Sequence, residues 1–95
     1  MYYYISALAD GGFKMGLNKT MATKLATKTM QCAALCMLES NKAPAELRDA
    51  ATSPSGGVIY GLHALDKQDC ASGIQAAIEA SYRRLKELVD VAPTN

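Results

Sequence analysis

Large aromatic side chains are scarce in this chain of 95 residues. It contains no tryptophan and one phenylalanine, although 49% of its residues are apolar. Alanine, leucine, methionine and cysteine carry most of the apolar content, and this composition favours closely packed helices over a β-sheet. We therefore predict an all-α fold. A single domain of this length buries a modest fraction of its surface, so we also expect a partner chain to complete the core.

An excess of charge of either sign is also lacking. Ten Lys and Arg residues stand against nine Asp and Glu residues, which gives a formal net charge of +1. Surfaces that bind nucleic acid or anionic membranes carry a clear positive excess. No apolar run in the sequence is long enough to cross a bilayer, and we expect no signal or transit segment among these residues, although an incomplete N-terminus could hide one. We expect neither a nucleic-acid partner nor a membrane partner.

Metal-binding and acid–base residues are few. The cysteines Cys32, Cys36 and Cys70 do not have the spacing of metal ligands, and His63 is the only histidine. We interpret the cysteines as reduced, buried packing residues, which suits a cytoplasmic or mitochondrial protein. Histidine is the side chain best suited to acid–base catalysis, but no carboxylate is predicted beside His63 to orient it. A packing or surface role is favoured for His63, and we assign no catalytic residue and no metal site.

The segment PAELRDAATSPSGGVIYGLHALD, residues 44–66, organises the chain. Pro44 suits the first turn of a short helix. Pro54 then forces Ser53 out of helical geometry, and the glycines that follow free the backbone. The helix that starts at Pro44 must therefore end before this loop.

A further short helix is predicted to begin near Val58, directly after Gly56 and Gly57. Its first amides have no intrahelical partners and point back at the loop, where glycines let an anionic group approach the backbone. One interpretation is a binding site for a carboxylate or phosphate. The other is a plain turn in which Ser53 or Ser55 caps the helix.

Three long helices are predicted around this segment. They cover residues 1–16, 19–40 and 70–89, and Asn18 and Asp69 cap the second and third. Gly11 and Gly12 would each weaken the first helix by about 1 kcal/mol relative to Ala. We therefore expect another helix to cross closely at these glycines. Residues 92–95 are predicted to be a disordered tail, which leaves a helical domain over residues 1–91.

The helix over residues 19–40 is predicted to be buried on more than one side. In its first half, one face carries a mostly apolar stripe and the opposite face carries lysines. The residues of this stripe are Met21, Leu25, Thr29, Cys32 and Cys36. From Met30 to Leu38 only Gln31 is strongly polar, so this half must be covered on nearly every side.

We infer that a second copy packs on this half of the helix, where small residues allow a close approach. The interface residues are predicted to be Met30, Ala33, Ala34 and Met37. The alternative is a helix at the centre of a monomeric bundle.

Residues 44–66 resemble the signature stretch of pyrroline-5-carboxylate reductases, which reads like HPAELKDxVtSPGGTTIxGLxxLE. The identities include Pro44, Leu47, the Ser53–Pro54 pair, Gly56 and the Gly61–Leu62 pair. Two further segments carry the resemblance over essentially the whole chain. ISALADGGFKMGL is similar to the family's ALADGGxKxGL, and IQAAIEASYRRLKEL is similar to its last helix.

The resemblance implies a specific part of that enzyme. These reductases join a Rossmann domain to a helical domain of about five helices, which interlocks as a homodimer and is like the C-terminal domain of 6-phosphogluconate dehydrogenase. This sequence resembles the helical domain alone, because no strand–turn–helix with a glycine-rich phosphate loop occurs. The resemblance implies NAD(P)H as cofactor of the intact enzyme and 1-pyrroline-5-carboxylate as substrate. We expect the chain alone to bind no cofactor and to be inactive.

The resemblance also implies a substrate-binding set in the loop: Ser53, Gly56, Gly57 and Val58. Ser55 departs from a glycine of the family pattern, and Gly57–Val58 departs from small residues ending in a threonine that helps to hold the substrate. Val58 has no side-chain donor, so only its backbone amide would remain. The hypotheses are therefore the dimerisation and substrate-loop part of a reductase, a stand-alone non-catalytic dimerisation module, or an unrelated helical adaptor.

Overall fold

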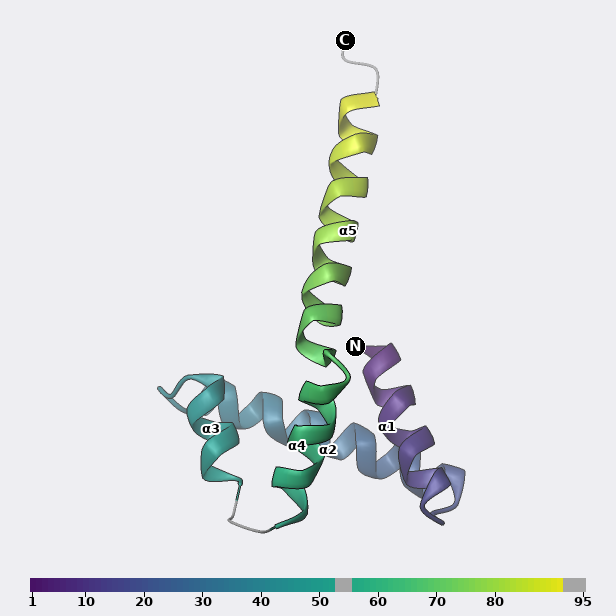
Figure 1. The fold of residues 1–95 in the computed structure, drawn as a ribbon, viewed down its shortest axis with the longest axis vertical. Helices are drawn as coiled ribbons and strands as arrows, with labels where there is room; N and C mark the ends of the chain where they lie inside the picture. The colour runs from purple at the N-terminus through teal and green to yellow at the C-terminus, as the bar shows by residue number, and fades with distance from the viewer. Residues whose placement is uncertain (53–55, 92–95) are drawn as a thin grey trace. The chain divides into compact units, whose positions relative to one another are not determined.

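The computed structural model describes residues 1–52 and 56–91, and within them all regular structure is helical (Figure 1). The five helices are α1 (Tyr2–Lys14), α2 (Lys19–Glu39), α3 (Pro44–Ala50), α4 (Gly57–Lys67) and α5 (Cys70–Val91). This confirms the all-α fold and the number of helices. Contacts group the chain into two compact units, residues 1–48 and the residues from Asp49 onward. The single domain over residues 1–91 stays a prediction, and the predicted tail, residues 92–95, lies outside the described residues.

The start of α2 is capped as the sequence predicts. Asn18 has an extended backbone, with φ −70° and ψ 155°, and its side-chain oxygen accepts a hydrogen bond from the amide of Met21 at 2.8 Å. This bond satisfies one of the amides that the first turn leaves without a partner. The helix ends at Glu39, one residue earlier than predicted, because Ser40 takes an extended conformation ahead of Pro44.

Helices α1 and α2 pack through small residues. The buried residues of the first unit are Ala9, Ala22 and Ala26, and Ile5 packs against them. A turn at Gly16, whose φ of 112° suits glycine, returns the chain from α1 to α2. Alanines at the contact let the two helices approach closely. The core of this unit is therefore narrow and leaves the larger side chains outside.

The stripe predicted to be buried on α2 is exposed in the chain, and this corrects the prediction. Met21 and Leu25 keep 47% and 50% of their surface accessible, and Cys32 and Cys36 are also exposed as free thiols. The face that packs on α1 is instead that of Ala22, one residue further along and so about 100° round the helix. The prediction assumed that the largest apolar side chains would be buried, whereas α1 and α2 pack through alanines, the smallest side chains available.

Gly11 and Gly12 differ in the contacts that a side chain would make. A Cβ atom at Gly12 would lie 3.3 Å from both the Cβ of Ala22 and the Cδ1 of Leu17, whereas one at Gly11 meets nothing within 4 Å. The predicted close crossing is therefore confirmed at Gly12. Gly11 has no such contact within the described part of the chain.

Alanine substitutions at these two glycines should have different effects on stability. Gly11→Ala is expected to stabilise the fold by about 0.5–1 kcal/mol, because alanine loses less backbone entropy in a helix. Gly12→Ala gains the same helix propensity, but its methyl group crowds Ala22. The free energy of unfolding should therefore stay unchanged or fall. Urea unfolding followed by circular dichroism at one fixed chain concentration measures both values. Equal stabilisation by the two substitutions would contradict the close contact at Gly12.

The second unit contains α4 and α5, which are connected by Gln68 and Asp69. Gln68 ends α4, and Asp69 takes a left-handed backbone with φ 54°, which aspartate tolerates better than most residues. The carbonyl of Asp69 accepts the amide of Gly73 at 3.0 Å, so Asp69 stands at the start of α5 as predicted.

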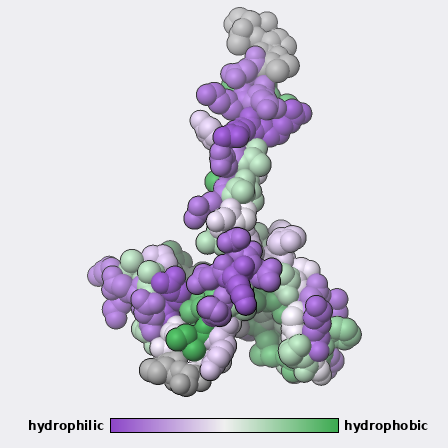
Figure 2. Space-filling view, in the orientation of Figure 1, coloured by the Kyte–Doolittle hydropathy of each residue, from purple (hydrophilic) through white to green (hydrophobic). Residues whose placement is uncertain are grey.

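Helix α5 runs for 22 residues, and every side chain from Ala71 to Asp90 is exposed. In Figure 2, hydrophilic and hydrophobic residues both reach the surface along this helix. The apolar side of α5 is therefore not buried within the chain.

Candidate functional site

The candidate substrate loop connects α3 to α4. The amide of Thr52 donates to the carbonyl of Asp49 at 3.1 Å, which closes the last turn of α3. Ser53, the first predicted substrate-binding residue, lies outside the described residues. The described side of the loop resumes at Gly56, which has φ −80° and ψ 164° and is the N-cap of α4.

The first turn of α4 supplies the backbone donors of the candidate site. The amide of Ile59 donates to the carbonyl of Gly56 at 3.2 Å. The amides of Gly57 and Val58 come before it, in the turn that has no intrahelical acceptors. The structure therefore brings Gly56, Gly57 and Val58 together at one helix start, as the sequence predicts.

This helix start is open to solvent. Gly57 is exposed, a Cβ atom placed on it meets nothing within 4 Å, and Val58 keeps 50% of its surface accessible. The partial positive charge of a helix N-terminus favours an anionic group at such a position. The side chains of Gly57 and Val58 offer no hydrogen-bond donor. Any recognition by these two residues therefore uses their backbone amides.

The predicted interface residues lie on the second half of α2. Met30 is half-buried, Ala33 and Ala34 are exposed, and Met37 keeps 36% of its surface accessible. Nothing in the described part of the chain covers this face fully, so it is available to another molecule.

An apolar groove of about 410 Å³ lies between α2 and α3. Its lining residues are Ala33, Cys36, Met37, Pro44, Leu47 and Arg48. Two of these, Ala33 and Met37, belong to the predicted interface. The groove was not predicted from the sequence, because its walls come from two helices; Leu47 was named there only as an identity with the family pattern.

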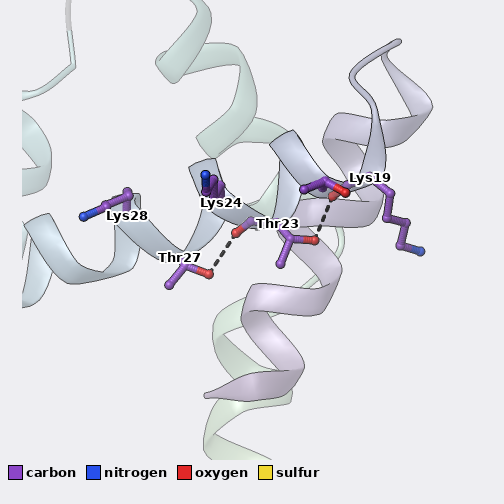
Figure 3. Close-up of a pocket in the computed structure, with 6 residues that line it drawn as sticks. Lys19, Thr23, Lys24, Thr27 and Lys28 are labelled. Carbon is purple, nitrogen blue, oxygen red and sulfur yellow. Dashed lines mark hydrogen bonds between the residues drawn. The ribbon is translucent and has the colours of Figure 1, made fainter.

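An open depression of about 460 Å³, lined by lysine and threonine side chains, follows the first half of α2 (Figure 3). It is lined by Lys19, Thr20, Thr23, Lys24, Thr27 and Lys28. The hydroxyls of Thr23 and Thr27 donate to the carbonyls four residues earlier, both at 2.8 Å. Lys19 pairs with Asp10 of α1 at 3.2 Å. These bonds occupy the hydroxyl protons, and we interpret the depression as a solvated helix face.

His63 and the cysteines do not form a reactive cluster. His63 is exposed on α4, and Cys70 is half-buried at the start of α5. Across residues 1–52 and 56–91, no three His, Cys, Asp or Glu side chains come together as metal ligands would. None of the described helices combines the length and apolar character needed to span a membrane.

The comparison with protein families excludes the hypothesis of an unrelated helical adaptor. A family model described as pyrroline-5-carboxylate reductase dimerisation matches residues 1–88 of the chain. The chain belongs to this dimerisation family. The match includes α1 to α4 and most of α5, so it covers the α2–α3 groove, the start of α4 and the exposed apolar side of α5.

Individual relatives are reductases of much greater length. The chain is 39% identical over 88 residues to pyrroline-5-carboxylate reductase 3 of Danio rerio, covering 93% of this chain and 31% of that protein. It is 43% identical over 84 residues to pyrroline-5-carboxylate reductase of a Synechocystis strain, covering 88% of this chain and 32% of that protein. The chain thus spans roughly a third of the length of these relatives.

A solved structure has the same fold. The crystal structure of Plasmodium falciparum pyrroline carboxylate reductase with NADP bound superposes with a TM-score of 0.88 at 28% identity. The superposition covers 92% of this chain and 33% of that one. The helical arrangement described above is therefore the fold of part of a reductase of this family.

Proposed function

We propose that residues 1–91 are the dimerisation and substrate-loop part of a pyrroline-5-carboxylate reductase. The observation that carries this proposal is the family match over residues 1–88, together with relatives that are reductases about three times as long. The reaction of the intact enzyme would transfer a hydride from NAD(P)H to the imine carbon of 1-pyrroline-5-carboxylate. The nitrogen takes up a proton, and the products are L-proline and NAD(P)⁺.

The part of the reaction assigned to this chain is the binding of the substrate carboxylate. The amides of Gly57 and Val58 are exposed at the start of α4, and Gly56 precedes them in an extended conformation. Amides of a first helical turn, together with the helix dipole, suit a carboxylate. We propose that Ser53 adds its hydroxyl to this set. The chain then holds and orients the substrate and contributes no group that accepts or donates the hydride.

The cofactor is proposed to bind elsewhere in the intact enzyme. A dinucleotide is usually held by a glycine-rich turn between a strand and a helix. The sequence has no such motif, and the described residues form helices only. The residues present do not fit NAD(P)H, and we propose that the chain alone neither binds NADPH nor reduces the substrate.

The second assigned role is formation of a homodimer whose helices interlock. The family is described by its dimerisation, and large apolar side chains on α2 and α5 are exposed in the single chain. Burial of each such side chain would contribute about 1.5–3 kcal/mol. We propose that Met30, Ala33, Ala34 and Met37 lie in the dimer interface, where the two alanines let helices approach closely.

A chimera tests the enzymatic proposal. A nucleotide-binding domain from a reductase of this family is joined ahead of Met1, and NADPH oxidation and proline formation are measured with 1-pyrroline-5-carboxylate. We expect activity from the chimera and none from either part alone. Saturable NADPH binding by the isolated chain would contradict the assignment of the cofactor to the other domain.

Val58→Thr is the matched variant of this chimera, because threonine has nearly the shape of valine and adds only a hydroxyl. A hydrogen bond to a charged group contributes about 1.5–3 kcal/mol. We therefore expect kcat/KM to rise by roughly tenfold to a hundredfold. A folded, dimeric chimera that stays inert with and without this substitution would contradict the substrate-loop role.

A second candidate function is a stand-alone dimerisation module without catalysis. It is favoured by two departures from the family pattern: Ser55 replaces a glycine, and Gly57–Val58 lacks the threonine whose hydroxyl would help to hold the substrate. Immunoblotting of source cells with an antibody to residues 19–40 separates the two. A band about three times the mass of this chain supports the reductase, and a band at 10.1 kDa supports the module. We expect either form in the cytoplasm or mitochondria, without nucleic-acid or membrane partners.

A further inference from the structure

We draw no further inference here: the strongest candidate, the lysine- and threonine-lined depression along the first half of α2, carries nothing because the hydroxyls of Thr23 and Thr27 are bonded within the helix, Lys19 pairs with Asp10, and nothing in the structure shows what would cover the lysines that remain.

Discussion

Ile78→Asp is expected to convert the protein from a dimer into single chains. Ile78 keeps 69% of its surface accessible in the single chain and lies on the apolar side of α5, between Ile74 and Tyr82. An isoleucine that becomes buried in the dimer interface stabilises the dimer by about 1.5–3 kcal/mol, and the substitution removes this contribution. A carboxylate without a partner in an apolar interface adds a further penalty. The substitution occurs twice in a homodimer. We expect the dimer dissociation constant to rise by at least a hundredfold, as measured by sedimentation equilibrium.

Ala76→Asp is the matched control for this change. It introduces the same carboxylate two residues earlier, on the opposite side of α5, where Ala76 is exposed. The dimer should tolerate it with little change in affinity. Equal dissociation by both substitutions would mean that added charge on α5 weakens the dimer wherever it is placed, and the apolar side of α5 would not lie in the dimer interface.

Ala33→Glu should have a comparably large effect from the α2 side. Ala33 is exposed in the single chain, lines the α2–α3 groove and belongs to the predicted interface. A glutamate there fills the space into which another helix would pack and places a charge in an apolar contact. We expect a dissociation constant raised by at least a hundredfold in sedimentation equilibrium, with the helix content of the chain retained in circular dichroism.

Gln31→Glu provides the comparison on α2. Gln31 is exposed and lies on the opposite side of the helix from Ala33. This substitution adds the same charge and should leave the dimer nearly unchanged. A dimer that resists Ala33→Glu as well as Gln31→Glu would place the interface on another face of α2.

The helices could be predicted from the sequence because local signals determine them. Asn18 caps α2 through its own side chain, and Pro44 begins α3 at the favoured first position. The start of α4 at Gly57 follows from the glycines that end the loop. These features depend on a few neighbouring residues, so the printed sequence contains the information needed to locate them.

The packing faces could be predicted only in part. Gly12 was recognised as a close contact, but the buried face of α2 is that of Ala22 and Ala26 and not that of Met21 and Leu25. Hydrophobic periodicity identifies which residues seek burial but not which molecule buries them. Large apolar residues are exposed in the single chain, and we propose that a partner covers them; the periodicity of one chain does not identify the covering surface.

The position of Gly56, Gly57 and Val58 in the fold was predictable, and their substrate-binding role stays a prediction. Gly56, Gly57 and Val58 do meet at the start of α4, because a helix start is a local feature. The α2–α3 groove was missed because it depends on how two helices lie against each other. Ser53 remains a prediction, as does the ligand of the site.

The mass of the chain in solution tests the central claim most directly. Sedimentation equilibrium of the unmodified protein over a range of micromolar concentrations should give about twice 10.1 kDa, with a dimer that persists on dilution. A single species of 10.1 kDa across that range, in a sample whose circular dichroism is fully helical, would contradict the proposal that this chain is a dimerisation domain.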